Sequence, residues 1–340
     1  MGSLVSDILY IRNSKRIIIT LAAFTVGVNA WMMVPDVIKY DLEPDTYWFV
    51  IPYVTTCDLS EFPELKQGEA QRSPLKWWIN CLSHTATGNY KLIPALFGIA
   101  VMPLVYLLGG VITNDRTIGL ISLLSFNLNP LYRDWATQGT YDQVWAFFFV
   151  LSLIFLFKKH NSFSIGMMAF SISAKFMAGL LLPVFLYTMY NQTRNKKHLL
   201  FTIGMIVTAA VIGLLVLGIN PVGSSVGFFP ERWDEAVFRN ISLFWQVIPV
   251  LALVVVINRN FIPHKKMPNQ KTVVYWMLAF FMINPFVYFF TLQDTYSYRY
   301  VPLAAFISVF IGMTIVNMGN WFVERNMGLH KKTPKVKVFP

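Results

Sequence analysis

The sequence predicts an all-α protein, a polytopic bundle of about nine or ten transmembrane segments. Of its 340 residues, 55% are hydrophobic and 13% are charged, whereas soluble domains carry roughly 25% charged residues. Apolar runs of about 20 residues recur along the chain, and a helix of that length crosses the hydrocarbon core of a bilayer. We therefore expect a single integral membrane domain over residues 1–340.

The positions of the charges predict which side of the membrane each loop occupies. The predicted segments are 17–34, 92–111, 117–132, 143–157, 163–190, 199–217, 241–257, 273–292 and 300–320. With this arrangement, 18 of the 28 basic residues and three of the 17 acidic residues fall on one side, together with both termini. The positive-inside rule assigns that side to the cytoplasm. The net charge of +11 then indicates membrane topology and contact with anionic lipids, and a nucleic-acid partner is not expected.

The segment 163–190 requires a different treatment, because it holds Lys175 within an apolar run. One continuous span would place the basic run 194–198 outside, against the charge rule. Two short helices forming a hairpin return the chain to the inside and place Lys175 at the outer tip. A lysine in the middle of a membrane segment is costly, so the hairpin is the favoured interpretation.

The first outer loop, 35–91, is too long and too aromatic for a simple connector. Its first residues after the membrane segment are rich in acids, among them Asp41, Glu43 and Asp45. The later run from Arg72 to Trp78 is basic and aromatic, which favours a helix in the membrane interface. The two cysteines of the chain, Cys57 and Cys81, also lie in this loop, and their pairing is left open.

Further charged groups occur in the other outer segments: Arg133, Asp134, Tyr141 and Asp142 after the third span, Lys175 at the hairpin, and Arg299 before the last span. Carboxylates beside the membrane can act as a general base on a hydroxyl group, and lysine and arginine can hold a phosphate. Structural roles are the alternatives. The acids can be solvated loop residues, Asp142 can cap a helix, and Arg299 can anchor the interface. Lys175 can contact a lipid headgroup or pair with an outer acid.

Taken in order, these segments resemble the GT-C superfamily of polyprenyl-phosphate-sugar-dependent membrane glycosyltransferases, especially its mannosyltransferase-like branches. The resemblance is carried by five short motifs: Asp41-Leu42-Glu43-Pro44-Asp45-Thr46-Tyr47, Arg72-Ser73-Pro74-Leu75, Asn129-Pro130 through Gly139-Thr140-Tyr141-Asp142, Ser173-Ala174-Lys175 with Leu182-Pro183, and Ser297-Tyr298-Arg299-Tyr300. It extends over most of residues 17–318.

The resemblance implies a GT-C-like frame and inverting transfer of a sugar, such as mannose, on the extracytoplasmic or lumenal face. The donor would be a dolichyl- or undecaprenyl-phosphate sugar, and the acceptor a glycan, a lipid or a protein. By position, Asp41 would be the base, with Asp45 and Glu43 as competitors. The other implied roles are donor-phosphate binding by Lys175, Arg299 and Arg72, and substrate binding by Arg133, Asp134, Tyr141 and Asp142.

No residue spacing predicts a metal site, no cofactor beyond the lipid-linked sugar is expected, and a divalent-metal requirement is left open. The acidic motif departs from the family by reading Glu43-Pro44-Asp45 in place of an adjacent Asp-Glu pair. Two alternative hypotheses follow. One is a non-catalytic subunit with the same frame that works beside a larger membrane partner. The other is a transporter of lipid or solute.

Overall fold

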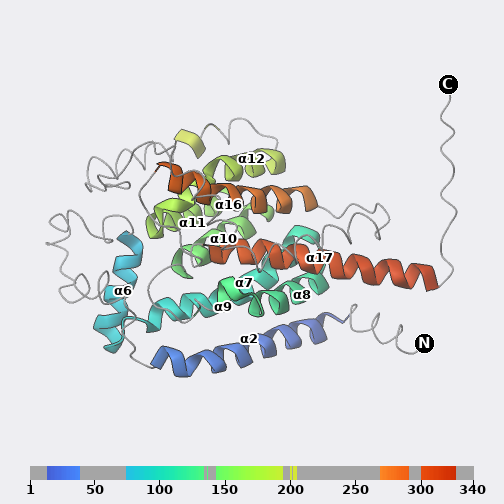
Figure 1. Ribbon diagram of the computed structural model, residues 1–340, viewed down its shortest axis with the longest axis horizontal. Coiled ribbons are helices and arrows are strands. Elements are labelled where there is room, and N and C mark those ends of the chain that lie inside the picture. The colour runs from blue at the N-terminus through green and yellow to red at the C-terminus, as the bar shows by residue number, and fades with distance from the viewer. Residues whose placement is uncertain are drawn as a thin grey trace.

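The computed structural model describes residues 14–38, 74–133, 136, 143–193, 200, 202–204, 269–290 and 300–326. Within these residues every regular element is a helix. The elements are α2 (Lys15–Ile38), α6 (Pro74–Thr87), α7 (Leu92–Thr113), α8 (Arg116–Asn127), α9 (Pro130–Arg133), α10 (Gln143–Phe157), α11 (Asn161–Ala174), the 3-10 helix η2 (Phe176–Leu181), α12 (Leu182–Thr193), α16 (Gln270–Phe290) and α17 (Val301–Asn326). The longer helices lie side by side, and α6 runs across one end of them (Figure 1).

Three of these helices, α2, α7 and α17, are long and apolar enough to cross a membrane. Their apolar stretches, 24, 22 and 22 residues long, exceed the roughly 20 residues that a bilayer core requires. The chain is therefore a helical protein that associates with a membrane. Most of the predicted segments 199–217 and 241–257 lies outside the described residues. The total number of crossings and the orientation remain predictions.

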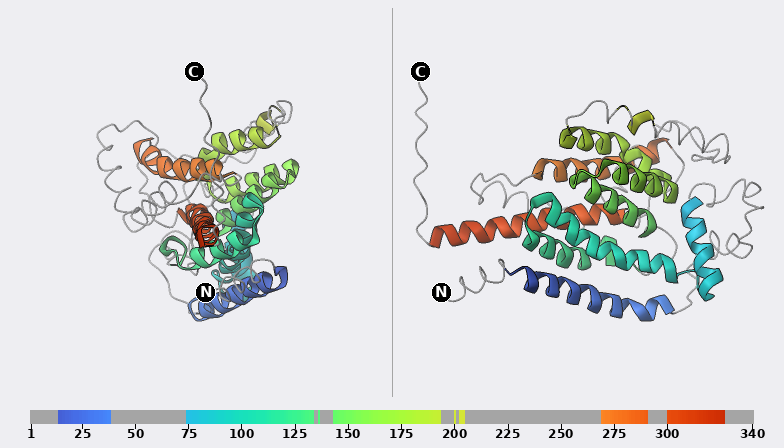
Figure 2. Two further views of the ribbon diagram at one scale, coloured as in Figure 1. Left: turned by 90° about the vertical axis from the view of Figure 1, so that its right-hand side faces the viewer. Right: turned by 180° about the vertical axis from the view of Figure 1, so that it is seen from behind.

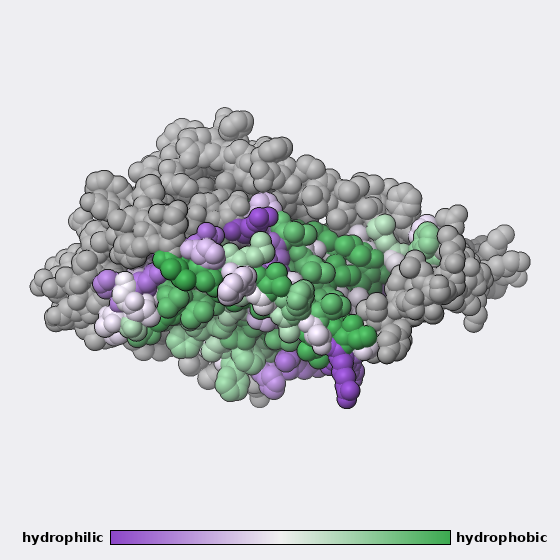
Figure 3. Space-filling view, turned by 90° about the horizontal axis from the view of Figure 1, so that it is seen from below, coloured by the Kyte–Doolittle hydropathy of each residue, from purple (hydrophilic) through white to green (hydrophobic). Residues whose placement is uncertain are grey.

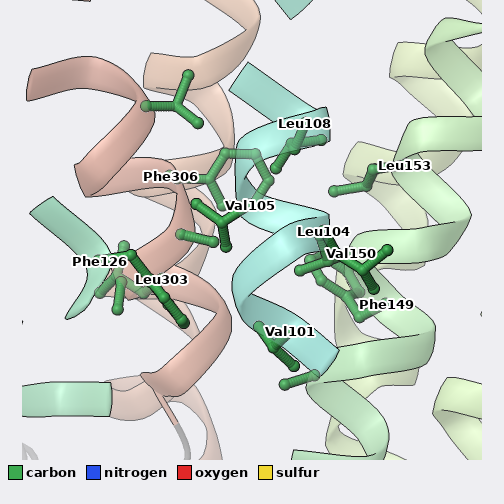
Figure 4. Packing of buried hydrophobic residues seen from close by; sticks show 14 of the residues in the cluster. Val101, Leu104, Val105, Leu108, Phe126, Phe149, Val150, Leu153, Leu303 and Phe306 are labelled. Atoms are coloured by element: carbon green, nitrogen blue, oxygen red, sulfur yellow. The ribbon is translucent and has the colours of Figure 1, made fainter. Parts of the chain in front are cut away.

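Helix α7 lies at the centre of the core and contacts α2, α6, α8, α10 and α17. Its residues are apolar on all sides, which is typical of a helix surrounded by others. Figure 4 shows Val101, Val105 and Leu108 of α7 between the side chains of α17 and those of α10. This packing makes α7 the helix against which the other elements are positioned.

Aromatic rings fill the space where α10, α16 and α17 meet. Phe149 lies at the centre of this cluster, with ring centroids 5.4 Å from Trp276, 5.6 Å from Phe280 and 6.4 Å from Phe306. The rings of Trp276 and Phe306 are stacked at 5.6 Å. Ring pairs at these separations add stabilisation beyond the burial of their area.

Glycines allow α7, α8 and α17 to approach closely. A Cβ atom on Gly119 of α8 would collide with the carbonyl oxygen of Tyr106, and one on Gly312 of α17 would lie 2.9 Å from the carbonyl oxygen of Ile118. One on Gly109 of α7 would lie 2.8 Å from Ser122 Oγ. Backbones in membrane helix pairs approach in this way through small residues. The three-helix contact therefore depends on the absence of side chains at these positions.

The prediction of one continuous segment over 117–132 is wrong. Helix α8 ends at Asn127, and α9 begins at Pro130. The Asn129 side chain accepts a hydrogen bond from the Leu131 amide at 3.0 Å, as an N-terminal cap does. Proline also disfavours the helical conformation of the residue before it. Together the cap and the proline start a new helix, and they leave α8 with 12 residues.

Residues 161–193 are divided at Lys175, which has an extended backbone between α11 and η2. Helix α12 then starts with Pro183 in its first turn, where the missing amide hydrogen costs nothing. The Gln192 side chain near the end of α12 donates to Asn269 Oδ1 at 3.2 Å, and Asn269 donates to the Ile112 carbonyl at 3.0 Å. Helix α12 therefore ends beside the end of α7, at the far end of the bundle from Lys175.

Helix α2 lies at the edge of the bundle, away from α12 and α16 (Figure 2). Only 11% of its most apolar 18-residue stretch is buried inside the protein, compared with 83% for the corresponding stretch of α17. Its exposed large side chains include Phe24, Trp31 and Met32. In the view from below, hydrophobic side chains cover much of the described surface and hydrophilic ones lie at its margins (Figure 3). An apolar helix exposed to this degree fits contact with lipid.

Candidate functional site

The end of the bundle crossed by α6 is held by a network of hydrogen bonds at the corner between α6 and α7. The Ser83 hydroxyl donates to the Asn89 carbonyl at 2.6 Å and accepts from the Ile93 amide at 3.0 Å. The Asn89 side chain donates to the Val37 carbonyl at 2.9 Å. These bonds bring the end of α2, the end of α6 and the start of α7 together. The acidic segment 39–73 therefore begins at this corner, directly after α2, and it ends at the start of α6.

A second contact positions the chain that leads into α10. The Tyr132 hydroxyl donates to the Gly98 carbonyl at 3.1 Å. A Cβ atom on Gly98 would lie 2.7 Å from the Ala136 carbonyl oxygen and 3.0 Å from Gln143 Cγ. Because Gly98 has no side chain, the backbone at Ala136 and the buried Gln143 can pack directly against α7. The segment 133–143 therefore returns to the bundle at the same end as α6.

Lys175 lies at this end as well. Helices α10 and α11 run antiparallel, since Ser171 Oγ donates to the Trp145 carbonyl at 3.0 Å and Ser164 Oγ donates to the Ser152 carbonyl at 2.8 Å. Lys175 is one helical turn beyond Ser171, about 5.4 Å farther along the axis. This places it beside the start of α10, and its side chain is partly buried. Helix α11 also contacts α6.

The described residues contain two of the ten residues predicted for a site. Lys175 lies at the helix break, and Arg133 ends α9 with an exposed side chain. The remaining predicted residues lie outside the described residues: Asp41, Glu43, Asp45, Arg72, Asp134, Tyr141, Asp142 and Arg299. Chain connectivity alone relates them to the described helices. Asp142 directly precedes α10, and Arg299 is followed by Tyr300 and α17.

Helix α6 carries buried polar residues that the sequence analysis did not select as site residues. Lys76 is 5% exposed and Asn80 is 2% exposed, and Ser83 is fully buried. Lys91, at the start of α7, is 2% exposed. Charged residues are rarely buried to this extent unless they are paired. The signal in the sequence is the spacing i, i+4, i+7 of Lys76, Asn80 and Ser83, which places all three on one helix face.

The two tryptophans of α6, which the sequence predicts at headgroup depth, differ in exposure. Trp77 is only 4% exposed and packs inside the protein. Trp78 is 46% exposed, with its ring edge-on to Trp77 at 5.7 Å. Trp77 is buried because α6 packs against both α7 and α11 instead of lying on the bilayer by itself. The interfacial position of α6 as a whole remains a prediction.

Cys81, next to Asn80 on α6, is buried and disulfide-bonded. The sequence holds one other cysteine, Cys57. Disulfides persist in extracellular and lumenal compartments and are rare in the cytosol. A disulfide at Cys81 is typical of proteins in such compartments.

The opposite end of the bundle carries a different set of charges. Helix α2 starts there and α17 ends there (Figure 1). The basic residues of the described chain at that end are Lys15, Arg16, Arg116, Lys158, Lys159, Lys271 and Arg325. Described cations also lie at the α6 end, namely Lys76, Lys91, Arg133 and Lys175, so the side of the membrane that each end faces remains a prediction.

Among the described residues, no three histidine, cysteine, aspartate or glutamate side chains are grouped as metal ligands. The polar side chains described at the α6 end include the cations and the amide of Lys76, Lys91, Lys175 and Asn80. Such groups bind anions and hydroxyl groups. No protein-family model, curated protein or solved structure matches this chain.

Proposed function

We propose that this chain is an integral membrane glycosyltransferase with a GT-C-like frame. It transfers a sugar from a polyprenyl-phosphate donor to an acceptor hydroxyl on the extracytoplasmic or lumenal face. The observation that carries the proposal is the position of Lys175. It lies at a break in an apolar helical segment, at the same end of the bundle as α6 and the two ends of the acidic segment 39–73.

The proposed chemistry needs a base for the acceptor and cations for the leaving phosphate. Asp41 is the first choice for the base, with Asp45 and Glu43 as competitors, because the acidic segment starts directly after α2. Lys175 and Arg299 hold the donor phosphate, and Arg72 assists. A lysine ammonium offers three donors to phosphate oxygens, and a partly buried position strengthens that attraction relative to water.

The orientation of the proposed site rests on two features. In the whole sequence, 18 of the 28 basic residues fall on the side predicted to hold the end opposite α6, which favours a cytoplasmic location for that end. The disulfide at Cys81 favours an oxidising compartment for the α6 end. The polyprenyl chain of the donor would lie in the bilayer beside the apolar helices, with its phosphate at the level of Lys175.

Replacing Lys175 with alanine tests the proposal. We expect the dissociation constant for a polyprenyl-phosphate sugar to rise roughly 10- to 100-fold, because a hydrogen bond between charged groups is lost. The measurement is saturation binding to the purified full chain in detergent. Lys158→Ala is the matched control, since Lys158 is exposed at the opposite end and should leave binding unchanged. Equal affinities of wild type and Lys175→Ala would contradict the phosphate role.

Gly98→Ala tests whether the segment 133–143 takes part in transfer. The new methyl group would meet the Ala136 carbonyl at 2.7 Å, so that backbone must move. We expect the rate of sugar transfer to fall roughly 10- to 100-fold, since displacements of about 1 Å in a site have effects of this order. Gly166→Ala is the control, because nothing lies within 4 Å of a Cβ atom there. If both variants transfer sugar at the wild-type rate, this segment has no part in the site.

A further inference from the structure

One side of α16 carries a line of exposed side chains that changes from charged to apolar along the helix. Four residues recur at i, i+4, i+7 and i+11, a spacing that places side chains along one side of a helix: Lys271, Tyr275, Leu278 and Met282. All four are exposed, Leu278 and Met282 by more than half. We call these four residues the α16 outer face.

The opposite side of α16 is packed into the bundle. The rings of Trp276 and Phe280 lie 5.6 Å and 6.0 Å from that of Phe306 on α17. Phe306 in turn lies beside Val105, near the middle of α7 (Figure 4). Both α7 and α17 are long and apolar enough to cross a membrane. The apolar part of the α16 outer face therefore lies at the depth of their apolar residues, where exposed surface contacts lipid chains.

The charged part of this face lies at the end of the bundle opposite α6. Asn269, directly before α16, donates to the Ile112 carbonyl at 3.0 Å and accepts from Gln192 at 3.2 Å. These bonds hold the start of α16 at the ends of α7 and α12, and Lys271 follows in the first turn of α16. In the described part of the chain, no carboxylate pairs with the Lys271 ammonium. Its charge is therefore available to an external anion.

Two tyrosines follow Lys271 on the way into the membrane. Tyr275 is one helical turn farther along α16, and its ring lies 6.0 Å from that of Tyr187 on α12 in an edge-on contact. Both tyrosines are exposed. A phenol hydroxyl and a lysine ammonium can each donate to a phosphate oxygen. Tyrosine is also the type of residue found where a membrane surface changes from polar to apolar.

The length of the α16 outer face matches one leaflet of a bilayer. A helix rises 1.5 Å per residue, so Lys271 and Met282 are about 16 Å apart along the axis. The hydrocarbon core is about 30 Å thick, which gives about 15 Å for each leaflet. A soluble anion would use only the lysine end of this face. A neighbouring protein helix would bury the lysine and would need to supply a matching negative charge.

We propose that the α16 outer face binds one anionic phospholipid from the leaflet at the end opposite α6. The Lys271 ammonium and the Tyr275 hydroxyl donate to the phosphate of its headgroup, and an acyl chain lies along Leu278 and Met282. Anionic lipids are concentrated in the cytoplasmic leaflet, which is the predicted side of this end. The inference is independent of the transferase function, because the bound lipid is a membrane component at the end of the bundle away from Lys175.

Lys271→Gln tests the headgroup contact. The purified full chain in detergent is titrated with dioleoyl phosphatidylglycerol, which is anionic, and dioleoyl phosphatidylcholine, which is zwitterionic, and bound lipid is counted by native mass spectrometry. We expect wild type to bind the anionic lipid about 10-fold more tightly than the zwitterionic one. Lys271→Gln should remove this preference, because a hydrogen bond between charged groups is lost. Equal affinities of wild type and Lys271→Gln for phosphatidylglycerol would overturn the proposal.

Lys15→Gln is the matched control. Lys15 is an exposed lysine at the same end of the bundle, on α2. The residues seven and eleven positions after it are the buried Ala22 and the partly buried Val26, so no exposed apolar line continues from Lys15 at this spacing. We expect Lys15→Gln to keep the wild-type preference for phosphatidylglycerol. An equal loss in both lysine variants would show a general charge effect and would contradict a site on α16.

Leu278→Asn and soluble glycerol phosphate test the apolar part of the face. The variant should weaken binding of both lipids several-fold, since a polar group would replace the surface on which the chain lies. Wild type should not bind glycerol phosphate at concentrations at which it binds the lipid. Equal binding of glycerol phosphate and the lipid would reduce the face to an anion site. A dimer in detergent that Leu278→Asn dissociates, with lipid binding unchanged, would make the face a contact between two copies of the chain.

Discussion

Replacing Gly119 with alanine should destabilise the folded protein by about 3 kcal/mol, at the upper end of the usual effect of overpacking. The added methyl group would collide with the carbonyl oxygen of Tyr106 and lie 3.3 Å from the amide nitrogen of Gly110. Both are backbone atoms of α7, so a side-chain rotation cannot relieve the contact. The measurement is thermal unfolding of the purified protein in detergent, and we expect a clear drop in Tm.

Gly27→Ala is the matched control for this experiment. Gly27 also lies inside a long apolar helix, but nothing lies within 4 Å of a Cβ atom there. Alanine should stabilise an open helical position by roughly 0.5–1 kcal/mol, because glycine loses more backbone entropy on folding. The same substitution is thus expected to have opposite signs at two positions. A Tm for Gly119→Ala equal to or above that of wild type would refute the close packing of α7 and α8.

Removing the proposed catalytic base, Asp41, should produce the largest effect on activity. We expect Asp41→Asn to lower the rate of sugar transfer about 100- to 10,000-fold, the range contributed by general-base catalysis. Donor binding should change little, since the base acts on the acceptor. The assay measures transfer of a labelled sugar from its polyprenyl phosphate, with donor binding measured in parallel on the same preparation.

Variants of the neighbouring acids test whether Asp41 is the residue that acts as the base. Asp45→Asn and Glu43→Gln are the competing variants, and one of the three should lose transfer while remaining folded. Asp36→Asn is the control, because Asp36 is exposed in the last turn of α2 and has no proposed role. If all three variants keep the wild-type rate, the base lies elsewhere or the chain is a non-catalytic subunit.

Hydrophobic runs predicted the long helices well, because uninterrupted apolar sequence has few other structures available. The segment expected at 143–157 coincides with α10, and the one at 92–111 differs from α7 by two residues at its end. The predicted segment 117–132 extends past Asn129-Pro130, where α8 has ended and α9 begins. Both the asparagine cap and the proline can be identified in the sequence, and they interrupt the helix although the residues around them are apolar.

The candidate site could be predicted only in part, because burial of a charge depends on packing partners that are distant in the chain. Lys175 was predicted as significant since it interrupts an apolar run. The sequence predicts Lys76 on a basic helix in the membrane interface. In the structure Lys76 is buried, because α6 packs against α7 and α11. Lys91 gave no signal, because a lysine at the start of an apolar helix is common.

The acidic segment is attached to the described helices at two points that respond to different surroundings. Its first anchor, α2, is joined to the α6–α7 corner at Val37, but only 11% of its most apolar stretch is buried, so most of that surface faces the surroundings. Its second anchor, α6, is packed into the bundle and joined to α7. A thicker or thinner bilayer tilts or shifts an exposed helix more easily than a packed one. The exposed helix α2 would then tilt relative to α6 and Lys175, so under the proposed function the rate of sugar transfer should depend on lipid chain length.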